Sequence, residues 1–351
     1  MEKLNIYLND LEERIDVDQE EQLYQEWITF AEGKWQEEYF DPKRTIKTPS
    51  KIQWPEININ DALEDDDLMI ISQFAMCSKQ LENSSGSIMS VRSNYGVGII
   101  PSLFGVKKFV MPYEMNTLPN VHPLENGIED IKRIIDSNIP DFSAGWGEKV
   151  FRLGKRYQEI RDKYPKIGKY VRIDHPDAQG PMDLCELLWG SNLFLDMYDH
   201  PDLVHRFLRK ITDTYEAFLE HWFSIVPNID NYHAYFGSLH KGSITVRDDS
   251  AMNLSPVIFE EFIYPYDNEV LNHFNGGAIH YCGKGDHFCP YFSKMNKLYA
   301  VNLSQPSYNN METIYQNTID KGINLIALDS STVKDALDNN RGLNALVHTS
   351  I

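Results

Sequence analysis

The sequence predicts an α/β protein, a TIM-like (β/α)8 barrel preceded by an N-terminal helical extension. From residue 88 onward, strand-like stretches alternate with amphipathic helical stretches over roughly 260 residues, which is the pattern of a barrel of parallel strands. Residues 1–87 show no such alternation and instead contain two helical stretches with acidic beginnings. We therefore divide the chain into a helical extension, residues 1–87, and a barrel, residues 88–351.

The composition describes a globular protein and argues against several classes of partner. Apolar residues make up 42% of the 351 residues, so the chain can bury a large core. A net charge of −19 argues against nucleic acid or an anionic membrane as a partner. There is no apolar run of about 20 residues and no signal-peptide pattern. We expect a cytoplasmic protein with reduced thiols, because its four cysteines form no CxxC pair.

The expected helices have recognisable beginnings. Residues 17–30 and 65–77 start with acidic side chains, which suit a helix N-terminus, and continue with spaced apolar residues. Pro201 opens the clearest helix of the barrel, whose apolar residues recur every three or four positions as far as Trp222. Ser255 can cap a further helix that begins at the next residue.

The expected strands are short runs of strand-forming residues between turn residues. In a parallel barrel the loops that follow the strands carry the functional side chains, so the site is expected at the strand ends. There is one candidate more than the eight that a barrel needs, and the surplus is expected among the first three. The candidates are residues 88–93, 108–113, 170–174, 232–236, 243–247, 278–282, 298–303, 323–328 and 344–348.

The site prediction depends most on His280 and Cys282, which lie two positions apart in a strand-like run between glycines. Alternate residues of a strand point to the same side, so the imidazole and the thiol face one way and can bind one metal ion. The alternative is a half-buried histidine and a core cysteine, because free cysteine is commonly buried.

Polar side chains also cluster after the strand at 170–174. His175, Asp177 and Gln179 precede a Gly-Pro turn that leads into a helix. These side chains can bind a ligand, or they can cap the turn.

A second polar cluster follows the strand at 243–247. Arg247 stands beside Asp248 and Asp249, with Asn253 shortly after them and His240 shortly before. The arginine and the carboxylates can form a structural ion-pair cluster. Alternatively, the carboxylates are an acid or base pair in which one raises the pKa of the other.

Two later strand ends add polar groups. Gln305 follows the strand at 298–303, where an uncharged side chain suits the orientation of a substrate. His348 ends the last apolar run of the chain.

With these features in order, the sequence resembles the uroporphyrinogen decarboxylase superfamily. This superfamily also contains zinc-dependent methyltransferases that move methyl groups between corrinoid proteins and thiols. The resemblance covers about residues 170 to 290 and implies a TIM-like barrel. The matching segments are Gln179-Gly180-Pro181, Leu187-Leu188-Trp189-Gly190, Asp199-His200-Pro201-Asp202-Leu203-Val204-His205, Asp248-Asp249, Leu254-Ser255-Pro256, Glu261-Phe262, Pro265-Tyr266 and Ile279-His280-Tyr281-Cys282-Gly283.

The two branches of the superfamily differ in their motifs. Decarboxylases carry Arg-Gln-x-Gly-Arg-Tyr near the N-terminus, and residues 1–90 contain no such motif; Arg92 is the nearest remnant. Methyltransferases bind zinc through His-x-Cys and a cysteine at the end of the last strand. His280 and Cys282 match the first two ligands, and His348 stands at the third place. Three protein ligands with one open position are typical of catalytic zinc.

The resemblance therefore implies a zinc-dependent methyltransferase that acts on a thiol, a small methylated molecule or a corrinoid protein. Two alternatives stay open: cofactor-free decarboxylation of uroporphyrinogen, as in porphyrin biosynthesis, and a non-catalytic barrel that binds a small molecule. The expected residues are His280, Cys282 and His348 for the metal, Asp248 and Asp249 for catalysis, and Arg92, His175, Asp177, Gln179, His240, Arg247, Asn253 and Gln305 for substrate binding.

Overall fold

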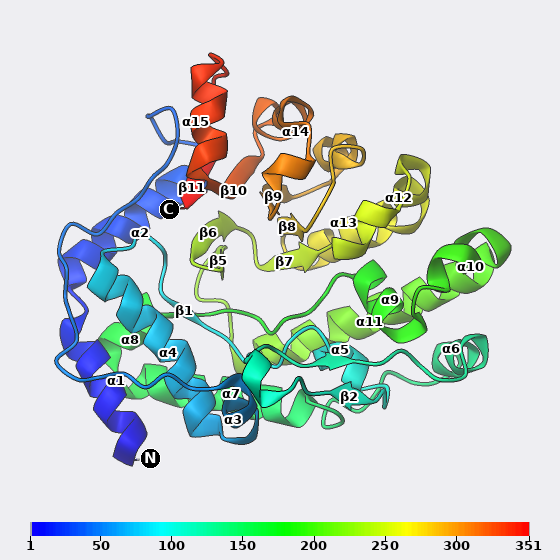
Figure 1. Cartoon of the computed structure of the whole chain (residues 1–351), viewed down its shortest axis with the longest axis horizontal. Coiled ribbons are helices and arrows are strands. Elements are labelled where there is room, and N and C mark those ends of the chain that lie inside the picture. Colours follow the sequence, from blue (N-terminus) through cyan, green and yellow to red (C-terminus); the bar gives the residue numbers. More distant parts are fainter. Residues whose placement is uncertain (1, 351) are drawn as a thin grey trace.

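A computed structural model describes residues 2–350, which form a mixed α/β fold around a five-stranded parallel sheet (Figure 1). Each strand of this sheet pairs with the next one along the chain. Because consecutive strands are parallel, their carboxyl ends lie along one edge of the sheet. The strands are β7 (Ile244–Arg247), β8 (Gly277–Tyr281), β9 (Leu298–Leu303), β10 (Asn324–Asp329) and β11 (Val347–Ser350).

A second parallel pair consists of β1 (Ser90–Val91) and β4 (Arg172–Ile173). The loop that follows β4 reaches the large sheet, where the backbone N–H of Gly180 donates to the carbonyl oxygen of Arg247 at 2.8 Å. The described strands do not join into one closed hydrogen-bonded ring. They show the expected α/β class and the consecutive parallel order, but not a complete barrel.

Two of the expected barrel strands belong to antiparallel hairpins, so their prediction as parallel strands is wrong. Within residues 108–113, β2 (Lys108–Phe109) pairs with β3 (Asn120–Val121). Within residues 232–236, β5 (Tyr232–Tyr235) pairs with β6 (Ser238–Lys241). A two-residue turn joins β5 to β6, which leaves no room for the crossover that a parallel partner needs.

Helices α2 (Val17–Ala31) and α4 (Asp66–Asn83) of the N-terminal segment agree with the prediction, whereas α1 (Glu2–Arg14) and α3 (Ile59–Glu64) were not predicted; α2 and α4 begin at side-chain caps. Asp16 accepts a hydrogen bond from the backbone N–H of Gln19, and Asp65 accepts two from Asp67 and Leu68. Such caps satisfy backbone donors that have no partner within the helix.

Two later helices, α11 (Pro201–Ile225) and α12 (Pro256–Phe262), begin where proline and a capping residue predict. Pro201 opens a helix of 25 residues, and the Ser255 hydroxyl accepts the N–H of Ile258. No helix within residues 2–350 has the length and apolar character to cross a bilayer. The helices are α5 (Ile99–Ser102), α6 (Ile128–Ile135), α7 (Gly147–Lys163), α8 (Pro165–Tyr170), α9 (Pro181–Trp189), α10 (Leu193–Asp199), α11 (Pro201–Ile225), α12 (Pro256–Phe262), α13 (Tyr264–His273), α14 (Met311–Asn317) and α15 (Ser330–Asp338), with 3-10 turns η1 (Tyr113–Met115), η2 (Asp249–Asn253), η3 (Cys289–Lys294), η4 (Pro306–Tyr308) and η5 (Ile319–Lys321).

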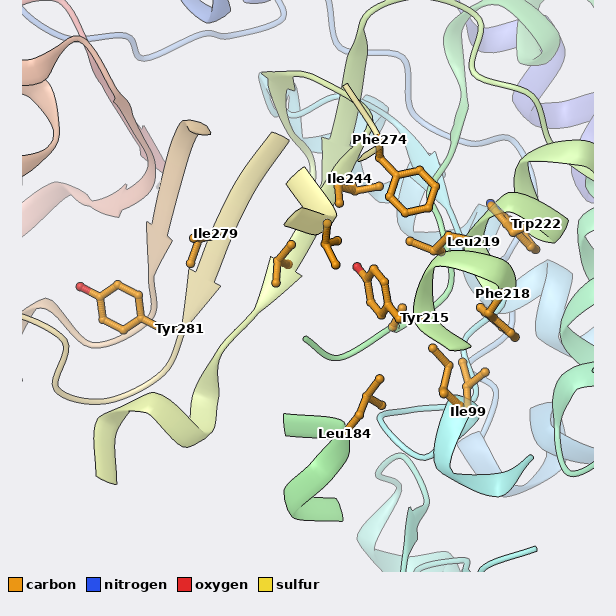
Figure 2. Packing of buried hydrophobic residues seen from close by; sticks show 14 of the residues in the cluster. Ile99, Leu184, Tyr215, Phe218, Leu219, Trp222, Ile244, Phe274, Ile279 and Tyr281 are labelled. Atoms are coloured by element: carbon orange, nitrogen blue, oxygen red, sulfur yellow. The ribbon is translucent and has the colours of Figure 1, made fainter. Parts of the chain in front are cut away.

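The main core lies between the parallel sheet and the helices that cover it. Figure 2 shows Tyr215 and Leu219 of α11 beside Ile244 of β7, with Ile99 and Leu184 on neighbouring helices. All five side chains are fully buried. Burial of large apolar side chains contributes about 1.5–3 kcal/mol each, so this layer fixes β7 and the loop that follows it.

A buried ion pair ties the extension to the strand that precedes the site. The Arg44 guanidinium donates to both carboxylate oxygens of Glu20, at 2.6 and 2.7 Å. It also donates to the carbonyl oxygens of Ser85 and Ser87, just before β1. Because these groups are almost inaccessible to water, each needs the other to remain buried.

Replacing Arg44 should therefore destabilise the fold strongly. Arg44→Met leaves the Glu20 carboxylate buried without its partner, so the free energy of unfolding should fall by about 3–5 kcal/mol in urea titrations. Lys43→Met is the matched control, because Lys43 pairs with Asp41 at an exposed position and should cost less than about 1 kcal/mol. Equal effects of the two substitutions would contradict the assigned role of Arg44.

Candidate metal centre

Three side chains of types that can ligate a metal converge where β7 and β8 end, namely Asp249, His280 and Cys282. The Nε2 atom of His280 lies 3.5 Å from Cys282 Sγ and 3.7 Å from Asp249 Oδ1. His280 and Cys282 face the same side because they are alternate residues of an extended segment. Asp249 begins η2 directly after β7, and its carboxylate accepts the Cys282 backbone N–H at 2.7 Å. One ligand atom from each residue lies within 4.8 Å of the other two.

The neighbouring strand fixes the orientation of the His280 ring. Asn302 of β9 is the register partner of His280, and its Oδ1 accepts from His280 Nδ1 at 2.6 Å. The Asn302 amide nitrogen donates to the carbonyl oxygen of Ile326, which defines the orientation of the amide. His280 Nε2 is thereby left as an acceptor that points toward Cys282 and Asp249. Metal-bound histidines are commonly held in this way through their second nitrogen.

The electrostatics of the cluster suit a cation. Burial lowers the pKa of His280, which keeps the ring neutral and able to act as a ligand. Burial also raises the pKa of the Cys282 thiol, and the Asp249 carboxylate raises it further against a hydrogen bond with Ser304. A bound cation would reverse the effect on Cys282, because it favours the thiolate.

The distances also fit tetrahedral zinc. Bond lengths of about 2.1 Å to nitrogen and about 2.3 Å to sulfur place the two atoms about 3.6 Å apart at a tetrahedral angle. The observed separation between His280 and Cys282 is 3.5 Å. Nitrogen, sulfur and carboxylate oxygen are all accepted zinc ligands, and three of them leave one position open for a substrate.

His348, the third ligand that the resemblance implies, does not belong to this group. Its Nδ1 accepts the backbone N–H of Ala327 at 3.0 Å. Its ring packs against Trp27 and Phe40 of the extension, with centroids 4.5 and 5.9 Å away. In the described chain, Asp249 therefore occupies the place beside His280 and Cys282 that was expected for His348.

The two expected catalytic carboxylates point in different directions. Asp249 lies beside His280 and Cys282 in the candidate metal centre, whereas Asp248 is fully buried. Asp248 faces the carboxyl of Asp267 on α13, and burial together with this neighbour raises the pKa of Asp248. Asp183 of α9 accepts the backbone N–H groups of Asp249 and Ser250 at 2.9 and 2.8 Å, and so holds the start of η2 in place.

Two of the expected substrate-binding arginines share one carboxylate beside the metal-binding group. Arg247 forms an ion pair with Asp177, and Arg92 lies 3.7 Å from the other oxygen of the same carboxylate. Gln179 also donates to Asp177, at 2.6 Å. The alternative of an ion-pair cluster is therefore observed for Arg247, but its partner is Asp177 and not the adjacent aspartates.

The two expected substrate-binding histidines are held by hydrogen bonds inside the protein. His175 donates from Nδ1 to the carbonyl oxygen of Pro176 and accepts the Thr245 N–H at Nε2. His240 is bonded to the carbonyl oxygen of Lys241 and to the Thr245 hydroxyl. Burial lowers their pKa values to about 3 and about 4, so both rings stay neutral.

The remaining expected residues lie on the loops around the centre. Gln305 accepts the backbone N–H of Gly283 at 2.5 Å and so supports the turn that follows Cys282. Asn253 is exposed at the end of η2. Asn302, Asp183 and Asp174 were not predicted as site residues, although Asn302 is recognisable as the polar residue that lies opposite His280 in the next strand.

Comparison with known proteins finds similarity at the level of structure. No protein-family model matches the chain, and no curated protein matches it in sequence. Among solved structures, the fold is similar to that of a methyltransferase from Methanosarcina mazei, with a TM-score of 0.61 over 93% of this chain and 92% of the other. The identity over this alignment is 15%. The likeness therefore shows that the two proteins share a fold.

The buried position of His348 leads to a pH-dependent stability. Burial lowers its pKa from 6.5 to about 3, whereas the unfolded chain regains the ordinary value. Between these values the unfolded state binds the additional proton, so the free energy of unfolding falls as the pH falls. In His348→Asn, whose side-chain oxygen can still accept from Ala327, this loss between about pH 6 and about pH 4 should be smaller by up to about 1.4 kcal/mol per pH unit.

Urea titrations across this pH range measure the slope. His122→Gln is the control, because His122 is exposed and its replacement should leave the slope unchanged. An unchanged slope in His348→Asn would show that His348 is protonated in the folded protein.

Proposed function

We propose that the chain is a zinc-dependent methyltransferase, in which His280, Cys282 and Asp249 hold the metal. The observation that carries the proposal is the convergence of these three donors at distances suited to zinc, with Asn302 orienting the histidine. The fold shared with a methyltransferase from Methanosarcina mazei supports the same reaction class. The methyl donor would be a corrinoid, carried by a partner protein or free, and the acceptor would be a thiol.

The chemistry follows from the proposed donor set. Zinc held by His280, Cys282 and Asp249 would supply Lewis acidity, which would lower the pKa of a substrate thiol and favour the nucleophilic thiolate at neutral pH. With a methylated corrinoid as substrate, methyl transfer would break its cobalt–carbon bond and form a sulfur–carbon bond, the thiol proton passing to solvent and the electron pair staying with the corrinoid. The protein's own part is to keep His280 neutral through burial and to place Asp249 beside it through the two hydrogen bonds to Asp183.

Metal analysis of single variants tests the proposed ligands. The wild-type protein should contain about one zinc per chain, and His280→Ala and Cys282→Ala should lose it because each removes a donor. Asn302→Leu should bind zinc about 10–100-fold more weakly, since it frees the second ring nitrogen. Cys289→Ala is the thiol control, because the buried Cys289 thiol donates to the carbonyl oxygens of Asp286 and Thr313 and lies outside the group of candidate ligands.

A comparison between two further variants tests whether Asp249 or His348 is the third zinc ligand. Asp249→Asn should weaken zinc binding, whereas His348→Asn should leave it unchanged. The opposite result would restore His348 as the ligand and remove Asp249 from the site.

Methyl transfer is tested with free methylcobalamin and a series of small thiols, by following the formation of cob(I)alamin and thioether. His280→Ala should lower the rate by at least about two orders of magnitude, because a Lewis-acidic metal contributes several kcal/mol to such a reaction. Circular dichroism of the variant checks that its fold is intact. Zinc-free protein that transfers methyl groups at the wild-type rate would rule out the proposal.

A further inference from the structure

A cavity of about 200 Å³, lined by both apolar and charged residues, lies beside the candidate metal centre, between α4 and the ends of β1, β4 and β5. At about 30 Å³ per water molecule it has room for about seven waters, which is the size of a short organic acid. Tyr235 and Arg247 separate the cavity from the metal-binding group. The Tyr235 ring centroid is 5.4 Å from that of His280, and Arg247 is the register partner of His280.

The cavity is lined by charged side chains with unused hydrogen-bonding atoms. Arg92, Arg247 and Asp174 all contribute to its wall. Among the described residues, Arg247 Nε and Asp174 Oδ1 are buried without a hydrogen-bond partner. Buried polar atoms are normally paired, because an unpaired one costs about 1–3 kcal/mol. A ligand that accepts from the arginine and bonds to Asp174 would satisfy both atoms.

The charged side chains that line the cavity determine which net charge a bound ligand should carry. Arg92 and Arg247 bring two positive charges, and the Asp177 carboxylate that both of them face balances one. Burial raises the pKa of Asp174 to about 7, against the lowering effect of its hydrogen bond with Ser90 and of the nearby arginines. With Asp174 protonated, the cavity carries one uncompensated positive charge and therefore suits a monoanion.

Phe236 forms part of the cavity wall, and its backbone adopts a conformation that residues other than phenylalanine usually occupy. It occupies the β5–β6 turn with φ +45°, followed by Gly237 with φ +81°, and its side chain is 62% exposed. A bulky residue at positive φ is a genuine outlier, since asparagine and glycine are preferred in such turns. The Phe236 ring covers both guanidiniums, with Arg92 at 4.8 Å and Arg247 at 5.7 Å from its centroid.

We propose that this cavity is a binding subsite for a short carboxylate, whose oxygens accept from Arg92 and Arg247 and lie against the unpaired Oδ1 of Asp174. The bound carboxylate would be part of the methyl donor or acceptor, and only in this respect does the inference rest on the proposed function. Binding itself requires no metal. A carboxylate matches both the single charge and the acceptor-only chemistry that the arginines need.

Binding through a protonated Asp174 makes the affinity dependent on pH. The ligand favours the protonated form, so its affinity should be full below about pH 6 and fall about tenfold between about pH 6 and about pH 8. The neighbouring histidines stay neutral in this range, because burial lowers the pKa of both. The charged and titratable groups that face or adjoin Asp174 from the surrounding elements are Cys77, Arg92, Arg172, His175, His233, Tyr235 and Arg247.

Isothermal titration calorimetry with sodium butyrate tests the proposal on the purified protein. Wild-type protein should bind butyrate, with proton uptake at about pH 8, and should not bind 1-butanol or butylamine. Asp174→Asn, whose amide remains a donor, should bind butyrate with no pH dependence. Arg92→Met should weaken binding at least about tenfold, whereas Arg152→Met, at an ion pair on α7, should not.

Phe236→Asn separates binding from folding. It creates the preferred Asn-Gly turn, so the variant should be at least as stable as the wild type and yet bind butyrate more weakly, because the ring over the arginines is lost. Equal binding of butyrate and 1-butanol, or an affinity that Arg92→Met leaves unchanged, would overturn the subsite.

Repeating the titration with zinc-free His280→Ala distinguishes the two proposals. Butyrate binding without zinc would support the subsite independently of the reaction. Zinc in the wild-type protein without butyrate binding would overturn the subsite and leave the proposed reaction standing.

Discussion

The parallel register of β7, β8 and β9 is the constraint on which the site depends. It sets Arg247, His280 and Asn302 side by side at one level of the sheet. Because the strands are buried on both faces and hydrogen-bonded along their length, none of these side chains can shift without its neighbours. The candidate metal centre lies on one side of this row of three residues, and the cavity proposed to bind a carboxylate lies on the other side. Any movement of β8 would therefore alter both at once.

This row of residues and its neighbours also include charged and polar groups whose burial costs free energy. Arg247 is 5% exposed and the pKa of its guanidinium is lowered to about 9 by burial, although Asp177 and the rings of Tyr235 and Phe236 surround it. Hydrophobic residues of the same volume are often as stabilising as such a buried pair. Buried charge, unpaired polar atoms and a strained turn occur together at this place. Such features are expected at a binding site, whereas a purely structural core does not need them.

The sequence predicted the α/β class, the helical extension and the strands that carry the site, because apolar periodicity and helix caps are local signals. The prediction of parallel strands was wrong at residues 108–113 and 232–236, where strand-forming residues form antiparallel pairs. The turn at Phe236 could not be recognised as a hairpin turn from its residues, since it lacks the usual Asn-Gly pair. His280 and Cys282 were found from their spacing. Asp249 was predicted for catalysis, but its position beside His280 and Cys282, like the contacts of Asn302 and Asp174, depends on which strands become neighbours, and that information is not local.

The buried carboxyl pair of Asp248 and Asp267 has a consequence for the ionic character of the whole molecule. Both lie in the core with no exposed surface, and the pKa of each is raised. The folded protein thus retains a proton that the formal charge of −19 does not count. Unfolding at neutral pH releases it into solution, whereas the buried histidines take protons up when the chain unfolds in acid. The native state is consequently most stable within a limited range of pH. Above this range the ionisation of the buried carboxyls favours unfolding, and below it the protonation of the buried imidazoles does so.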